Sequence, residues 1–124
     1  MMLHHISLQV SDLEASARLY DAMLFSLQYI RAWTAADAIG YGLESGKDKF
    51  SIKKRGSSVV APGEGFHLAF SAQSREDVDN FYEAALKFGA KDNGPPGLRP
   101  HYADNYYAAF VIDLDGYQIE AVYK

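Results

Sequence analysis

Cysteine is absent from this sequence of 124 residues. That absence excludes disulfide bonds, metal sites built on thiolates and a cysteine nucleophile, and it is compatible with a reducing compartment. A strong charge of one sign is also lacking, because the formal net charge is only -4 at pH 7. The sequence therefore offers no broad basic surface for a polyanion, and we expect no nucleic-acid partner.

Long hydrophobic runs are missing as well. No apolar segment approaches the roughly 18 residues that a membrane-spanning helix needs, and His4 and His5 interrupt the apolar N-terminus where a signal peptide would need a continuous run. We therefore expect a soluble, cytoplasmic protein with no membrane partner. A hydrophobic content of 48% at this length is enough for one globular domain spanning residues 1–124, but not for two independent domains.

What the chain does have is an internal repeat. When the sequence is shifted by 62 residues, several identical residues coincide. The pairs are His5 and His67, Glu14 and Glu76, Tyr20 and Tyr82, Ala22 and Ala84, and Leu24 and Leu86. Self-similarity at a fixed period is the mark of a repeated supersecondary unit. The sequence thus predicts two modules, residues 1–60 and 61–124.

The first module has the pattern of one strand, one helix and three further strands. Apolar residues alternate over residues 3–10, which predicts a strand with His5 on the face opposite Ile6. Ser11 with Glu14 forms a capping-box signature for the helix that follows. Short strands are expected at residues 28–33, 38–43 and 50–53.

The second module repeats that order. We expect a strand over residues 66–70, a helix capped by Ser74, a short strand from Lys91, a proline-rich ordered loop, and a hairpin of residues 106–112 and 118–122. The predicted fold class is α+β, with two tandem βαβββ modules forming a curved mixed-sheet cup and helices outside.

Glu120 lies between apolar residues in the last predicted strand. A lone carboxylate in such surroundings is costly unless a positive partner compensates it. A divalent metal ion held by His5, His67 and Glu120 would do so, and this 2-His-1-carboxylate arrangement leaves coordination positions open for a substrate. The alternative is that both histidines are hydrogen-bonded core residues and Glu120 is a solvated strand residue.

The sequence at this point resembles the vicinal oxygen chelate superfamily, which includes glyoxalase I, fosfomycin-resistance proteins, extradiol dioxygenases and bleomycin-resistance proteins. The carriers are His4-His5-Ile6-Ser7-Leu8-Gln9-Val10, Phe66-His67-Leu68-Ala69-Phe70, the loop Asn93-Gly94-Pro95-Pro96-Gly97-Leu98-Arg99-Pro100, and Tyr106-Tyr107-Ala108-Ala109-Phe110 through Asp113-Leu114-Asp115-Gly116 to Ile119-Glu120-Ala121-Val122. The resemblance covers the whole chain.

The resemblance implies a metal site at His5, His67 and Glu120, with iron, manganese, nickel or zinc as the ion. It implies an enzyme of lyase, isomerase or dioxygenase type that acts on a small molecule with adjacent oxygens, and a homodimer in which the site lies in one chain or between two. The sequence departs from the family at Ser51, where glyoxalase I normally supplies a fourth ligand, at Leu114 and at Ala103. A metal-free small-molecule binding protein of the bleomycin-resistance type is the alternative.

Further residues are weaker candidates for the site. Tyr102 is a candidate acid or orienting donor. His101 and Tyr107 are candidate pocket residues. Arg99 can pair with an anionic substrate through its planar guanidinium, although anchoring its own loop is the alternative.

Overall fold

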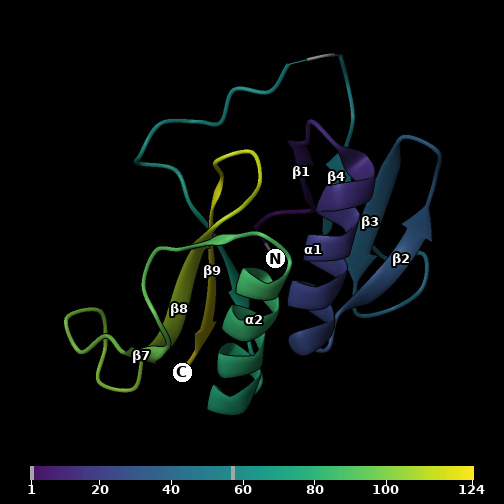
Figure 1. Ribbon diagram of the computed structural model, residues 1–124. Coiled ribbons are helices and arrows are strands. Elements are labelled where there is room, and N and C mark those ends of the chain that lie inside the picture. The colour runs from purple at the N-terminus through teal and green to yellow at the C-terminus, as the bar shows by residue number, and fades with distance from the viewer. Residues whose placement is uncertain (1, 57) are drawn as a thin grey trace.

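The computed structural model describes residues 2–56 and 58–124, which form two successive modules (Figure 1). The first contains β1 (Ile6–Gln9), α1 (Leu13–Ser26), β2 (Ile30–Thr34), β3 (Ala38–Gly42) and β4 (Phe50–Lys53). The second contains β5 (Leu68–Ser71), α2 (Arg75–Lys87), β6 (Lys91–Asp92), β7 (Gly97–Leu98), β8 (Tyr107–Ile112) and β9 (Gln118–Tyr123). The α+β class and the two tandem modules predicted from the repeat are confirmed.

The strand register repeats together with the sequence. β1 pairs in parallel with β4 and places Ser7 opposite Ser51, whereas β5 pairs in parallel with β9 and places Ala69 opposite Glu120. Ser7 and Ala69 are matched by the same shift that matches the two histidines. Ser51 and Glu120 therefore occupy equivalent positions in the two modules.

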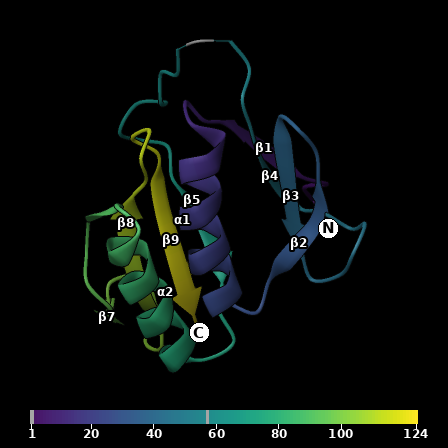
Figure 2. The ribbon, with the colours of Figure 1, turned by 45° about the vertical axis from the view of Figure 1, so that its right-hand side comes forward.

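The strands form two sheets, with the orders β1-β4-β3-β2 and β5-β9-β8-β6, and β7 also pairs with β8. Over the described residues, no strand of one sheet pairs with a strand of the other. β1 and β5 are thus edge strands, and the predicted cup is divided within one chain into two sheets (Figure 2). The hydrophobic pattern fixes which face of each strand is buried, but it does not specify whether two edge strands meet.

Prolines divide one strand of the second module. Pro95 and Pro96 have no N–H group to donate to a ladder, and they lie between β6 and β7. Hydrogen bonds from Asn93 N to Phe110 O (2.9 Å) and from Phe110 N to Gly94 O (2.8 Å) keep the segment before them against β8. The proline-rich segment expected as a loop is therefore part of the sheet at β7.

The first helix begins one residue later than its capping signature predicted. Asp12, not Ser11, is the N-cap, and its carboxylate accepts a hydrogen bond from Ala15 N at 3.0 Å. Ser11 N instead donates to the carboxylate of Asp115 in the second module at 3.2 Å. The prediction for the second helix is confirmed, because Ser74 accepts from Asp77 N at 3.0 Å.

A buried hydrogen bond joins the two modules. α1 and α2 pack against each other, and Tyr20 of α1 donates to Asp113 Oδ2 at 2.6 Å. Tyr117 N donates to the other carboxylate oxygen of Asp113 at 2.9 Å. Burial raises the pKa of Asp113, and the hydrogen bond from Tyr20 opposes that rise. The helix of one module is thereby attached to the β8–β9 turn of the other.

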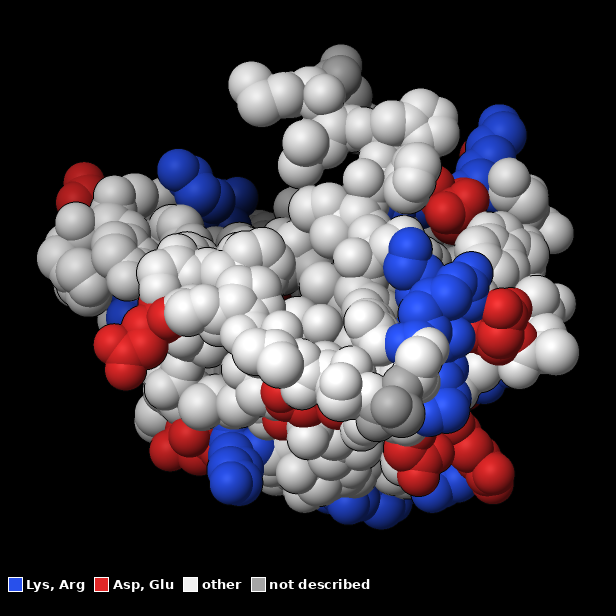
Figure 3. Space-filling view, turned by 90° about the horizontal axis from the view of Figure 1, so that it is seen from above, with Lys and Arg blue, Asp and Glu red and all other residues white. Residues whose placement is uncertain are grey.

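The surface carries charges of both signs. On the face in Figure 3, basic side chains lie beside acidic ones, and Arg55 and Asp37 form an ion pair at 2.7 Å. Within residues 2–56 and 58–124, no helix is both long and apolar enough to cross a membrane.

Replacing Tyr20 with Phe tests the link between the modules. The substitution leaves one oxygen of buried Asp113 without its side-chain donor, so we expect a loss of about 1–3 kcal/mol in the free energy of unfolding at neutral pH. Because the folded-state pKa of Asp113 is raised, the neutral carboxyl predominates at low pH, and the loss should shrink as the pH falls through that pKa. Urea unfolding at neutral and acidic pH measures both effects.

Tyr82→Phe is the matched control, because Tyr82 is the repeat counterpart of Tyr20 and is partly exposed. Its effect should stay within about 0.5 kcal/mol. Equal losses in the two variants would contradict the assigned role of Tyr20.

Candidate functional site

Glu120 is a buried carboxylate in the middle of β9, with 1% of its surface exposed. Tyr106, which precedes β8, donates its hydroxyl to Glu120 Oε2. His67 Nε2 lies 3.2 Å from Glu120 Oε1. The free-energy cost of burying this carboxylate is thus offset by two polar partners, Tyr106 just before β8 and His67 just before β5.

The strand register explains why His67 reaches Glu120. Ala69 is opposite Glu120 in the parallel β5–β9 pair, and His67 precedes Ala69 by two residues. Residues two apart in an extended segment lie on the same face, so the imidazole and the carboxylate share one face of the sheet. The His67 side chain is 53% exposed, and its ring is therefore accessible from solvent while it touches a buried acid.

Tyr106 was not among the predicted site residues. Its pKa is raised, first because burial disfavours the phenolate and second because the hydroxyl donates to Glu120, so it remains a protonated donor. The adjacent tyrosines Tyr106 and Tyr107 would point to opposite faces in an extended chain, but alternation alone does not identify which one meets Glu120.

The two weaker aromatic candidates lie next to Tyr106. The rings of Tyr102 and Tyr106 meet edge to face with centroids 5.1 Å apart, and His101 lies 4.3 Å from Tyr102. Tyr102 is 58% exposed. His101 and Tyr102 thus connect the surface to Tyr106, which donates to Glu120. Among the hydrogen bonds of the described residues, neither His101 nor Tyr102 bonds to Glu120 itself.

Tyr107 and Arg99 have other contacts. Tyr107 lies on the helix side of β8, where its hydroxyl donates to Asp79 of α2 at 2.7 Å. Arg99 donates to Gly97 O at 2.8 Å and to Pro95 O at 2.7 Å, as the loop-anchoring alternative expected. Its guanidinium also covers the ring of Phe110, which is the cross-strand neighbour of Glu120.

His5 is not part of this cluster. It is exposed at the start of edge strand β1, and its Nδ1 lies 2.8 Å from Nδ1 of His4. Within the described part of the chain, no group of three or more His, Cys, Asp or Glu side chains is arranged to hold a metal ion. One chain therefore brings together His67 and Glu120 and leaves His5 apart from them.

The module of His5 has no acid in the equivalent position. Ser51 takes the place of Glu120, and its hydroxyl is hydrogen-bonded to Ser7 Oγ at 2.8 Å. The duplicated scaffold thus carries a neutral hydroxyl pair in one half and a carboxylate with a histidine in the other.

Comparison with known proteins assigns the fold to a family. The model of the glyoxalase/bleomycin resistance protein/dioxygenase superfamily matches residues 2–121. The chain belongs to this superfamily. A Bacillus subtilis (strain 168) relative, uncharacterized protein YqjT, is 32% identical, with 97% of each chain covered.

Solved structures of this superfamily have the same fold. A glyoxalase/bleomycin resistance protein from Albidiferax ferrireducens T118 has a TM-score of 0.86 and 32% identity, with 100% of this chain and 99% of that chain covered. The fosfomycin resistance protein FosX from Mesorhizobium loti has a TM-score of 0.69 and 20% identity, with coverages of 98% and 91%. The second likeness concerns the fold alone.

The two side chains brought together in the second module, His67 and Glu120, are of types that bind divalent metal ions. A neutral imidazole nitrogen and a carboxylate oxygen are ligands that iron, manganese, nickel and zinc accept. His67 Nε2 and Glu120 Oε1 already lie close together on an accessible face. Two donors are fewer than the three that the sequence predicted, and no third His, Cys, Asp or Glu side chain joins them in the described part of the chain.

Tyr106→Phe tests whether Tyr106 supports Glu120. The variant leaves Glu120 Oε2 without its donor at a buried position, and we expect it to lower the free energy of unfolding by about 1–3 kcal/mol. The exposed neighbour Tyr102 provides the control, because its hydroxyl forms no hydrogen bond to an acid in the described residues, and Tyr102→Phe should change stability by less than about 0.5 kcal/mol. Urea unfolding of the two variants under one buffer gives the comparison, and a Tyr106→Phe protein as stable as the control would refute the assignment.

Proposed function

We propose that this protein is a divalent-metal-dependent enzyme of lyase, isomerase or dioxygenase type that acts on a small molecule with adjacent oxygens. The observation that carries the proposal is the buried carboxylate of Glu120 with accessible His67 Nε2 at 3.2 Å. A buried acid next to a half-exposed imidazole is a pair of ligands with an open side for a substrate.

His5 of a second copy of the chain is the proposed third ligand. His5 and His67 each precede an edge strand, β1 and β5, whose outer side is free of strand partners over the described residues. Unpaired edges favour association, and a closed dimer would bring β1 of each chain to β5 of the other. A homodimer then has two equivalent sites, each with His67 and Glu120 from one chain and His5 from its partner.

The roles of the side chains follow from their contacts. Tyr106 holds Glu120 Oε2, so that Oε1 is the oxygen directed to the ligand side. Arg99 fixes the loop next to Phe110 and shapes the wall of the site. A bound divalent ion supplies Lewis acidity for a substrate oxyanion. Ser51 offers no carboxylate where glyoxalase I normally has its fourth ligand, so we propose a three-ligand site.

A metal-free binding protein is the second candidate function. It is favoured by the fact that Tyr106 and His67 already satisfy Glu120, and that no buried side-chain polar atom in the described residues lacks a hydrogen-bond partner. In that case His67 would be a positioning residue at the wall of a ligand pocket. Location in the cytoplasm stays a prediction under either function.

Metal analysis of Glu120→Gln distinguishes the two functions. Protein prepared without chelator or nickel resin should carry near-stoichiometric iron, manganese, nickel or zinc. Even substitutions beside metal ligands cost about 10–100-fold in affinity, so replacing a ligand should weaken binding by at least about tenfold. Elemental analysis and titration with a competing chelator measure the content and the affinity.

Ser51→Ala is the matched control, because Ser51 has the equivalent register position in the other module. It should retain the metal of the unaltered protein. Full metal content in Glu120→Gln would overturn the proposed site at Glu120, and no metal in the unaltered protein after reconstitution would overturn the enzyme proposal in favour of the metal-free binding protein.

A further inference from the structure

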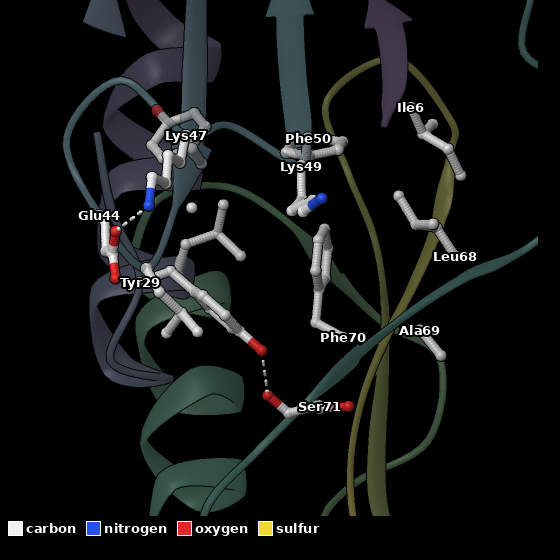
Figure 4. Close-up of a pocket in the computed structure, with 14 residues that line it drawn as sticks. Ile6, Tyr29, Glu44, Lys47, Lys49, Phe50, Leu68, Ala69, Phe70 and Ser71 are labelled. Atoms are coloured by element: carbon white, nitrogen blue, oxygen red, sulfur yellow. Dashed lines mark hydrogen bonds and ion pairs between the residues drawn. The ribbon is translucent and has the colours of Figure 1, made fainter. Parts of the chain in front are cut away.

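The proposed dimer determines which faces of the chain remain open to a small molecule. An apolar hollow lies at the seam between the modules, with Ile6, Phe50, Leu68 and Phe70 in its wall (Figure 4). Ile6 and Leu68 belong to β1 and β5, whose edges meet a second chain in that dimer, so the hollow is open only in an isolated chain. β2 is at the other end of the first sheet, away from this pairing.

Trp33 of β2 is the only tryptophan of the chain. Arg31, two residues earlier, donates to Asp21 of α1 at 2.7 Å, and regular alternation would place Trp33 on the same helix side of the sheet. The register of β2 against β3 shifts between Arg31 and Trp33, however, and Trp33 is opposite Gly40. An irregularity of this kind changes the direction in which the following side chain points.

Gly40 leaves the space that the indole occupies. A β-carbon at this position would collide with Nε1 and Cε2 of Trp33. Gly40 is not among the glycines with a positive φ, so the position requires space and not backbone freedom. The next residue, Tyr41, donates to Asp21 on the helix side, and Gly40 therefore points to the other side of the sheet. The indole packs there, with 36% of Trp33 exposed.

This side of the first sheet also carries the residues of the proposed metal site. Gly40 is opposite Ser51, and Ser51 is opposite Ser7. Cross-strand partners share a face, and His5 precedes Ser7 by two residues in an extended segment. Ser51 is also the register equivalent of Glu120. The indole is therefore one strand away from the position that a ligand occupies in the other module.

The second module has an exposed aromatic ring on its own site face. Tyr102 is 58% exposed, and its ring meets the ring of Tyr106, which donates to Glu120. In the proposed dimer, the indole of one chain and Tyr102 of the partner subunit belong to the same shared site. Aromatic side chains favour a planar aromatic partner over a saturated ring of the same size.

We propose that Trp33 is a specificity-determining residue of the shared site, and that the substrate carries an aromatic ring that stacks on the indole while its adjacent oxygens meet the metal. This inference rests on the proposed function and narrows its substrate class. An aromatic pair is stabilised beyond the area that it buries, whereas a cyclohexyl ring gains from burial alone. The site therefore prefers an aryl compound to its cyclohexyl analogue.

Mandelate and hexahydromandelate test this preference, because both carry the same adjacent hydroxyl and carboxylate oxygens and differ only in having a planar or a saturated ring. After reconstitution of the protein with metal, calorimetric titration should show mandelate binding about two- to tenfold more tightly, the size of an aromatic pair. Trp33→Leu should lower this ratio to about one and retain the metal. Phe25→Leu is the matched control, because Phe25 is an exposed aromatic residue on α1, and it should keep the ratio.

Two further measurements examine the indole itself. Gly40→Ala keeps the tryptophan but displaces its ring from β3, so it should also lower the ratio. Because Trp33 is the only tryptophan, its emission reports on this ring alone. Saturating mandelate should protect that emission from quenching by acrylamide, since the bound ring covers the indole.

Four results would each overturn the inference: no binding of mandelate, equal affinities for the two acids, a ratio kept in Trp33→Leu or Gly40→Ala, or acrylamide quenching that mandelate does not change. Circular dichroism and metal content are measured on the same samples. Equal affinities in a protein that holds its metal contradict the role of Trp33 alone. A protein that holds no metal after reconstitution overturns the enzyme proposal whatever its ratio, so the two failures are distinguishable.

Discussion

The burial of the Glu120 carboxylate is the constraint around which the second module is arranged. A charged group at 1% exposure has to be paired, and its partners come from the residue before β8 and the residue before β5. These contacts fix the positions of His67 and Tyr106 on one face of the sheet. The first module has no such requirement, since Ser51 and Ser7 satisfy each other at the equivalent place. The same scaffold is thus present twice, while a buried acid at this position is present in only one of the two copies.

The contact between the modules has an equally large effect on the site. α1 packs on α2, and Tyr20 binds buried Asp113, so the modules are joined through helices and the β8–β9 turn. β1 and β5 then remain as edges on separate sheets, and His5 stays away from His67 and Glu120. A chain built in this way holds two of the three predicted metal ligands together and keeps the third, His5, apart from them. The seam left between β1, β4 and β5 also produces the apolar cavity at Phe50 and Phe70.

Much of this arrangement was predictable from the sequence, for identifiable reasons. The repeat at His5 and His67 gave the two modules, and period-two alternation gave the face on which Glu120 lies. The approach of His67 to Glu120 was expected from the predicted metal triad, and the parallel pairing of β5 with β9 is its physical cause. The sequence alone does not identify the N-cap of α1, because the side chains of Ser11 and Asp12 both accept hydrogen bonds. In the structure Ser11 N donates to Asp115 of the second module, and Asp12 is the residue that caps the helix. Nor could alternation identify Tyr106 rather than Tyr107 as the partner of Glu120, since that depends on where β8 begins.

The most direct test of a site shared between chains is complementation between two defective variants. His5→Ala and Glu120→Gln are purified separately, then unfolded, mixed and refolded together, and the metal content is measured by elemental analysis. Each variant alone should bind little metal, whereas random pairing should restore about a quarter of the sites, because half of the dimers are mixed and each mixed dimer has one intact site. A mixture that binds no more metal than the two separate variants would contradict the account.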